Sequence, residues 1–317
     1  MFSLRSCNDN EADDFWKKSS AATVFTSPKV LDKLGQSCEW WVAEKGSEPF
    51  VLWPVVLDKA GRPILPPFSY FFGPVWSNTA LQRAPSSQFA DRLRAYETFT
   101  EFLFDRYGAL NFELSPQFLD VRAFSWWNYG DPDSPQFVID PRYTAQLRNL
   151  QSKPVQGILT GFRELRRREV KRVDSEDRYS LHSEVSWTEV VDLYARLFEN
   201  QGISVEPGAS HALERLSNLV GTEWASLTVV KERETGMTVS AVFTLRAKGV
   251  SNMVLNLTHP DHKKPGAGTW AVVHSILDAK RLGDDVYDFN GANSPRRGDD
   301  KHSYGAEDVL YFRLSLT

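Results

Sequence analysis

Residues 263–269 (KKPGAGT) have the clearest chemical signature, because they lie between a strand pattern at 250–258 and a helix pattern at 269–282. Glycine lets the backbone come close to a ligand, and the free N–H groups at the start of a helix attract phosphate. The candidate ligand-binding residues are Lys263, Lys264, Gly266, Ala267, Gly268 and Thr269. A turn that uses glycine only for its geometry is the alternative.

The strand pattern before this segment has an unusual polar face. Alternate residues from Asn252 to Thr258 point to one side of a strand, and the apolar residues between them point to the other. Central strands normally bury both faces, so this polar face stands out. Asp288 and Asn290 also share a face, at the end of the last strand pattern. We predict that Asp288, Asn290 and Asn256 line a reaction site, with hydrogen bonds to loops as the alternative.

The elements that position these residues repeat in two halves. Each half reads as helices, consecutive antiparallel strands and then a strand–helix–strand unit. The first half contains strand patterns at 39–45 and 50–57 and an amphipathic helix over 88–107. The second half contains a helix that begins with a capping box at Ser186–Glu189, and then strand patterns at 224–232, 239–246, 250–258 and 286–290.

This repeat predicts an α/β fold of the α+β type with two domains, each a mixed, mostly antiparallel sheet flanked by helices. The stretch 142–160 interrupts regular structure, so we expect the domains at 1–150 and 151–317. A basic run at 163–172 lies between the halves. It is either a solvated helix face, with Glu164 and Glu169 interspersed, or a surface for an anionic substrate.

Composition narrows the class of protein. The 317 residues carry a formal net charge of −4, which argues against a general nucleic-acid binder. Two cysteines without metal or redox spacing fit a reducing compartment. The sequence shows no signal-peptide core and no apolar run long enough to span a bilayer, so we expect a cytoplasmic protein. His259 and His262 have no third ligand at a recognisable spacing, so we expect no metal.

Two motifs resemble known families. The 263–269 segment resembles the pyrophosphate loop of the GNAT acetyltransferases, usually written Arg/Gln-x-x-Gly-x-Gly/Ala, although a lysine takes the first position here. The stretch 287–314 resembles the closing segment of the FemABX-like, double-GNAT family, where Asp-Phe-x-Gly precedes Lys-x-x-Phe-Gly. Here those motifs are Asp288–Gly291 and Lys301–Gly305, with Tyr304 in place of the phenylalanine. By layout the resemblance covers most of the chain, and its specific matches lie within 263–305.

The resemblance implies an acyltransferase that moves an acyl group from acyl-coenzyme A directly to an amine, without a covalent intermediate. In GNAT folds two adjacent strands separate to admit the thioester, and a backbone N–H stabilises the oxyanion. Asp288, through water, is the candidate to collect the amine proton. Cys7 and Cys38 lie far from the motifs, which disfavours a covalent relay. The candidate catalytic residues are Asp288, Asn290, Asn256, His302 and Tyr304.

The acceptor that the resemblance favours is a nucleotide-linked amino sugar used for surface polysaccharide such as lipopolysaccharide. Lys301 takes the position of a diphosphate contact on an expected loop, assisted by Arg296 and Arg297. An exposed basic loop is the alternative. The expected aromatic contacts are Tyr70, Phe72 and Trp127, unless they pack in a core. Other readings are an aminoacyl-tRNA-dependent transferase that acts on a peptidoglycan precursor, and a non-catalytic binding module.

Overall fold

The computed structural model describes residues 2–131, 133–200 and 207–317, which form two compact units. Unit 1 comprises the chain up to Arg142 together with Leu310–Thr317, and unit 2 comprises Tyr143–Val309. Strands β7 (Val138–Leu147) and β13 (Glu307–Leu316) each begin in one unit and end in the other. The division therefore falls at 142/143 instead of 150, inside a strand, and the last eight residues belong to the first unit.

Unit 1 contains an antiparallel sheet in the order β1-β2-β3-β4, with β5 also paired to β3, and a separate pairing of β6 with β13. Helix α4 packs its apolar stripe, Ala95, Tyr96, Phe99 and Leu103, into the core and ends at Gly108 in a left-handed conformation. The elements are β1 (Phe2–Cys7), α1 (Asp9–Lys18), α2 (Pro28–Lys33), β2 (Cys38–Lys45), β3 (Glu48–Leu57), β4 (Pro63–Ile64), β5 (Val75–Trp76), α3 (Asn78–Leu81), α4 (Pro85–Tyr107), β6 (Leu110–Leu114) and α5 (Arg122–Ser125).

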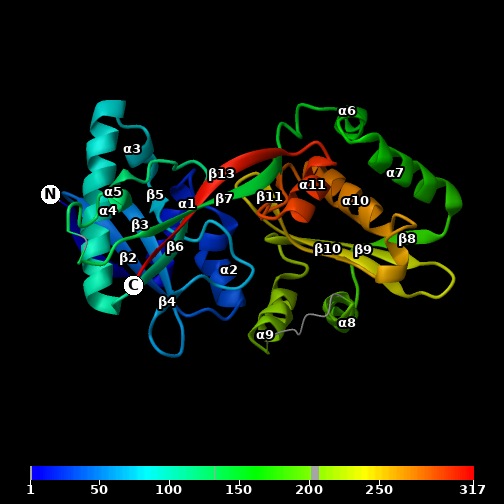
Figure 1. The fold of residues 1–317 in the computed structure, drawn as a ribbon, viewed down its shortest axis with the longest axis horizontal. Helices are drawn as coiled ribbons and strands as arrows, with labels where there is room; N and C mark the ends of the chain where they lie inside the picture. Colours follow the sequence, from blue (N-terminus) through cyan, green and yellow to red (C-terminus); the bar gives the residue numbers. More distant parts are fainter. Residues whose placement is uncertain (1, 132, 201–206) are drawn as a thin grey trace. The chain divides into compact units, whose positions relative to one another are not determined.

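Unit 2 is built on a sheet in the order β7-β12-β11-β10-β9-β8, in which only β11 and β12 pair in parallel. Figure 1 shows α10 and α7 on one side of β9 and β10, and α8 and α9 on the other. The elements are α6 (Val155–Thr160), α7 (Glu164–Glu176), β8 (Tyr179–His182), α8 (Trp187–Glu199), α9 (Pro207–Leu216), β9 (Ala225–Glu232), β10 (Thr238–Ala247), β11 (Val250–Thr258), α10 (Ala267–Arg281), β12 (Val286–Asp288) and α11 (Pro295–His302).

These elements confirm the predicted fold class, mixed and mostly antiparallel sheets flanked by helices. The burial patterns explain why they form. β10 is buried along most of its length because helices cover both faces of the sheet. One expectation is wrong: residues 295–302 form helix α11 and not a loop. None of the described helices is both long and apolar enough to cross a bilayer.

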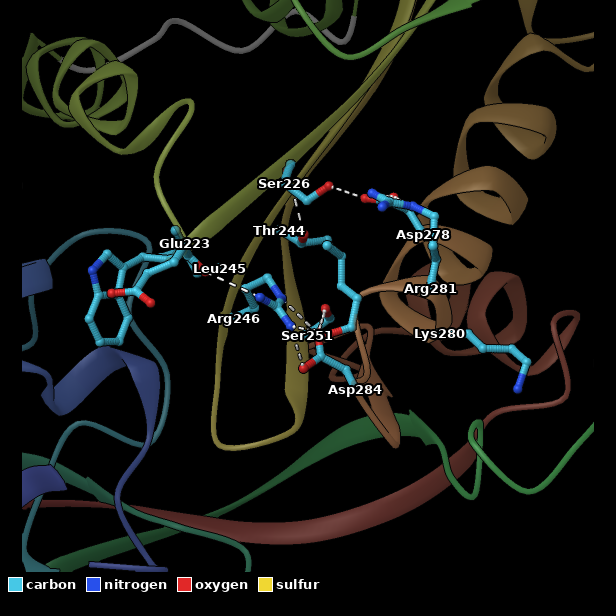
Figure 2. Close-up of polar contacts among 12 residues, drawn as sticks. Glu223, Ser226, Thr244, Leu245, Arg246, Ser251, Asp278, Lys280, Arg281 and Asp284 are labelled. Atoms are coloured by element: carbon cyan, nitrogen blue, oxygen red, sulfur yellow. Dashed lines mark hydrogen bonds and ion pairs between the residues drawn. The ribbon is translucent and has the colours of Figure 1, made fainter. Parts of the chain in front are cut away.

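An ion pair inside unit 2 connects β10 to the turn between α10 and β12 (Figure 2). Nε and Nη2 of Arg246 bind the two carboxylate oxygens of Asp284 at 2.9 and 3.0 Å, and the Ser251 hydroxyl donates to the same carboxylate at 2.6 Å. The Asp284 side chain is 2% exposed. Because the carboxylate is buried, its hydrogen bonds are needed to offset the cost of removing it from water.

We expect Arg246→Met to lower the free energy of unfolding by about 3 kcal/mol, because it leaves a buried carboxylate without its cation. Urea unfolding of the full chain measures this change. The matched control is Arg281→Met, since the Arg281 side chain is 71% exposed and pairs with Asp278, three residues earlier on the same helix. A control effect within about 0.5 kcal/mol is expected. If Arg246→Met lowered the free energy of unfolding no more than Arg281→Met does, the contact with Asp284 would contribute little to stability.

Candidate functional site

Strands β11 and β12 separate after a short paired stretch. They share three residue pairs, the last of which is Asn252 with Asp288. In the described part of the chain, β11 from Met253 to Thr258 pairs only with β10. The β10–β11 register also shifts, because Phe243 pairs with Leu255 and Thr244 pairs with Met253. Val254 is therefore an extra residue, a β-bulge, at the point where the gap opens.

The bulge changes which residues share a face. It interrupts the alternation between Asn252 and Asn256, so the continuous polar face expected from counting by twos is not formed. Asn252 is buried, and its Nδ2 donates to the Leu245 carbonyl at 3.4 Å. Asn256 is exposed and Thr258 is half-buried. Of the polar residues on this strand, Asn256 is the one that is fully open to solvent.

Asp288 ends β12 and is fully buried. Its carboxylate accepts hydrogen bonds from the Thr144 hydroxyl, from Gln146 Nε2 at 2.7 Å and from the backbone N–H of Asn290 at 2.7 Å. Burial raises the pKa of Asp288, and these hydrogen bonds oppose that rise. The carboxylate is therefore engaged in joining β7 to β12 and in turning the chain after Asp288. Sequence reasoning missed Thr144 and Gln146, which carried no local motif.

Asn290 and Lys301 form a clamp on the inside of that turn. Asn290 has a φ of 52°, a left-handed conformation, and its Nδ2 donates to the Met253 carbonyl across the gap at 3.0 Å. The Lys301 ammonium donates to the Asn290 carbonyl and, at 2.6 Å, to the Gly291 carbonyl. Lys301 is 8% exposed. The structure thus places this ammonium against backbone carbonyls, and not on an open surface as a diphosphate contact requires.

The other residues expected near the chemistry lie in different surroundings. Tyr304 is buried, stacks on Phe289 at 5.6 Å and lies under the Arg166 guanidinium. Burial raises the pKa of Tyr304. His302 is half-buried, and its Nε2 lies 3.0 Å from Asp308 Oδ1. Arg296 and Arg297 lie in α11, but their side chains fall outside the described residues.

The glycine segment has the strand–turn–helix geometry expected of a phosphate-binding turn. Gly266 precedes α10 with a φ of 93°, and a Cβ on Gly268 would collide with the Thr258 hydroxyl at the end of β11. Lys263 and Lys264 are exposed. The first turn of α10 contributes backbone N–H groups that have no intrahelical partner. The arrangement is suited to an anion held by these N–H groups and by the two lysines.

Helix α7 packs against this turn, which sequence reasoning did not foresee. Arg172 Nη2 donates to the Lys264 carbonyl at 2.7 Å, and the Thr269 hydroxyl donates to Glu169 at 2.6 Å. Arg166 Nη1 also donates to the Thr269 hydroxyl, at 2.8 Å. The basic run of residues 163–172 is therefore not uniformly solvated, since Arg166 is 17% exposed whereas Arg168 is 73% exposed.

The aromatic residues expected to contact a substrate are mainly packed in unit 1. Phe72 is 2% exposed and belongs to the interior. Tyr70 and Trp127 are half-buried, and Trp127 packs against the hydrophobic core around Trp53 and Phe99. For Phe72 the alternative of core packing is the correct one. Among the described residues, no three histidines, cysteines or carboxylates are grouped in a way that could hold a metal ion.

A hollow of about 540 Å³ lies elsewhere in unit 2. It is lined by Ser226 and Thr228 of β9, His274 and Asp278 of α10, and the end of β8 at His182. β8 pairs with β9 only from Val229 onward, so the hollow lies beside the part of β9 that β8 leaves open. None of the residues of the gap or of the glycine segment lines it. We therefore place the candidate site at the gap between β11 and β12, and not at this hollow.

We expect Gly268→Ala to destabilise the protein by about 1–3 kcal/mol, because the new methyl group overlaps the Thr258 side chain. The double variant Gly268→Ala with Thr258→Ala should recover most of that loss, since it removes the colliding hydroxyl. Thermal unfolding and urea titration of the four proteins of this cycle give the coupling energy. If the stability loss of the double variant equalled the sum of the losses of the two single variants, the close contact between Gly268 and Thr258 would be contradicted.

We expect Lys301→Met to cost about 2–3 kcal/mol, because it leaves two carbonyls without a donor in a buried place. Lys301→Arg should not rescue stability, since a planar guanidinium does not fit where a compact ammonium donates to adjacent carbonyls. Lys59→Met, at an exposed lysine, is the control, with an effect within about 0.5 kcal/mol. Urea unfolding measures all three. If Lys301→Arg kept full stability, residue 301 would instead have an open position from which it could contact an anion.

The comparisons with known proteins agree with this geometry. A sequence model of the acetyltransferase (GNAT) domain family matches residues 161–302. No curated protein matches the chain. The chain is similar to the crystal structure of FemX at 10% identity, with a TM-score of 0.67 over 98% of this chain and 96% of that one.

Two further solved structures are similar over nearly their whole length. One is a tandem GNAT protein from the clavulanic acid biosynthesis pathway, at 12% identity and a TM-score of 0.58, with 100% of this chain and 98% of that one covered. The other is L-PGS from Bacillus licheniformis, at 13% identity and a TM-score of 0.58, with 98% and 92% covered. At these identities the likeness shows the fold alone. Residues 161–302 thus match the GNAT acetyltransferase domain model, and the chain as a whole has a FemABX-like tandem GNAT fold.

Proposed function

We propose that the protein is an N-acyltransferase that takes an acyl group from acyl-coenzyme A and transfers it to an amine in the gap between β11 and β12. The observation that carries this proposal is the continuity of the gap with the glycine segment. β11 loses its β12 partner at Met253 and ends at Thr258, against which Gly268 of the phosphate-binding turn packs. A pantetheine arm that lies in the gap has its diphosphate at the start of α10.

The residues of the gap support direct transfer. The nitrogen–carbon bond to the amine forms, the carbon–sulfur bond of the thioester breaks, and the proton lost by the amine is balanced by the one gained by the thiolate. We assign the oxyanion contact to the backbone N–H of Val254, which the bulge sets apart from the regular ladder with β10. The Asp288 carboxylate is already engaged with Thr144, Gln146 and Asn290, so we assign proton uptake to water in the gap.

Lys263 and Lys264 are the side chains that we propose to bind the diphosphate. Both are exposed beside the helix start, and a lysine donates to phosphate as a compact charge. The acceptor that we propose is an amine on a small anionic molecule, of which a nucleotide-linked amino sugar is the example that the sequence favours. The second candidate donor is aminoacyl-tRNA. The packing of α7 favours this donor over coenzyme A. It brings the Glu169 carboxylate to the Thr269 hydroxyl at the start of α10, where a negative charge repels the diphosphate of coenzyme A.

Release of free thiol from a panel of acyl-coenzyme A donors tests the proposal, with and without UDP- and dTDP-linked amino sugars. We expect release that depends on an amine, and Lys263→Met with Lys264→Met should weaken donor binding by roughly tenfold or more, as lost charge-assisted hydrogen bonds do. Lys59→Met is again the matched control. No release with any pair, together with no calorimetric binding of acetyl-coenzyme A, would overturn the coenzyme A assignment in favour of the tRNA donor.

A further inference from the structure

A second group of polar side chains lies in unit 1, on neighbouring strands. It comprises Glu113 of β6, Tyr311 and Arg313 of β13, Arg142 of β7, and Tyr70 of the loop after β4. Arg313 is the direct cross-strand partner of Glu113. We call this group the arginine–tyrosine cluster. Of these residues, Tyr70 alone was expected from the sequence to contact a substrate.

Glu113 is the buried carboxylate that fixes Arg313 and the loop beside it. Its side chain is fully buried, and one of its oxygens accepts from Arg313 Nε at 2.9 Å and Nη2 at 2.7 Å. The other oxygen accepts from the Phe71 backbone N–H at 2.9 Å. The Arg313 side chain is 40% exposed. One edge of its guanidinium is thus fixed by a buried carboxylate, while other N–H groups face solvent.

Arg142 supplies a second guanidinium that is only partly used. Its Nη1 donates to Asp140 at 3.1 Å, and its side chain also hydrogen-bonds to Tyr311. Its Nε is buried and has no partner among the described residues. Burial raises the pKa of Tyr311 to about 12, so this phenol stays neutral and serves as a fixed partner of Arg142.

The loop beside the cluster has a strained backbone. Phe68 and Phe71 have φ values of 58° and 54°, in the left-handed region that bulky residues rarely adopt. Glu113 holds the Phe71 amide, and the Phe71 ring meets the Tyr311 ring edge-on at 4.9 Å. Such strain persists only where the surrounding structure over-determines it, and it gathers at ligand-binding sites. Here it sets the position of half-buried Tyr70, whose ring lies 6.3 Å from that of Phe71 and close enough to Tyr311 to interact electrostatically with it.

We propose that the arginine–tyrosine cluster binds an anionic group of the acceptor, a carboxylate or a phosphate. Each guanidinium is a planar fork of N–H donors that suits oxyanion oxygens, and a guanidinium that other residues already hold in place loses little freedom on binding. Glu113 is engaged with inner donors, and the 46% exposed Asp140 carboxylate pairs with Nη1 of Arg142, so an anion would bind to the remaining N–H groups of the two guanidinium groups. The assignment to the acceptor rests on the proposed function, whereas anion binding itself does not.

Hydrogen–deuterium exchange of the full chain tests this inference, with inorganic pyrophosphate or succinate as probe and chloride at matched ionic strength as reference. We expect one probe to slow exchange in residues 66–76. Arg142→Met and Arg313→Met should each raise the probe concentration needed for half-protection by about tenfold, as the loss of a charge-assisted hydrogen bond does. Pyrophosphate as the better probe indicates a phosphorylated acceptor, and succinate indicates a carboxylate.

Further variants keep the test decisive if a methionine variant unfolds. Arg313→Lys keeps the charge but loses the forked geometry, so its affinity should fall between those of wild type and Arg313→Met. Tyr70→Phe keeps the ring contacts with Phe25 and Phe71 and should weaken binding. Arg168→Met, at a 73% exposed arginine of unit 2, should have no effect on residues 66–76. Protection that is absent with both probes, or unchanged in the arginine variants, would mean that the cluster only braces the loop.

The same titration is repeated with saturating acetyl-coenzyme A, while protection of residues 263–270 is followed in parallel. Protection at 66–76 without any at 263–270 would retain the anion site and reject the coenzyme A donor. Protection at 263–270 without any at 66–76 would retain the coenzyme A donor and reject the anion site. The two proposals can therefore fail separately.

Discussion

The separation of two parallel strands is the constraint on which the candidate site depends. β11 and β12 share three residue pairs and then diverge, and the chain around them is arranged to hold that divergence. On one side, the Val254 bulge bends β11 away from a regular ladder. On the other, Asp288 and Lys301 fix the turn that carries the chain away from β11. A backbone left unpaired inside a sheet has to find other partners or a ligand.

That need explains why buried polar groups gather beside the gap. Asp288 and Lys301 are both nearly inaccessible to solvent, yet each is saturated with hydrogen bonds from or to its surroundings. Their contacts position the backbone of the turn after β12. The motif that resembles the FemABX-like family is thus as much a folding requirement as a binding one. A polar motif does not by itself distinguish these two uses.

Local periodicity predicted most elements of the fold, and long-range contacts account for the errors. The strand at 250–258 and the helix before Gly108 were predicted correctly because apolar spacing and a terminal glycine suffice for them. The bulge at Val254 has no local signal, so the predicted polar face failed. The helix that begins after Ser186 was also predicted correctly, although the Ser186 side chain makes no cap hydrogen bond and Glu189 also binds Lys231 of β9 and Thr238 of β10. The buried positions of Asp288 and Lys301 depended on β7 and on the turn after β12, which no spacing within their own motifs could reveal.

The path of the chain through unit 1 has a consequence for how the protein is made. β6 ends at Leu114, and its partner strand β13 is synthesised much later, with Leu114 opposite Phe312. Unit 2 lies in sequence between these two strands, so it is complete before unit 1 can close. During translation the edge of β6 is therefore unpaired for almost two hundred residues of synthesis, a state that invites wrong pairing. A chain that terminates just before β13 therefore contains nearly all of unit 2, while β6 of unit 1 lacks its partner strand.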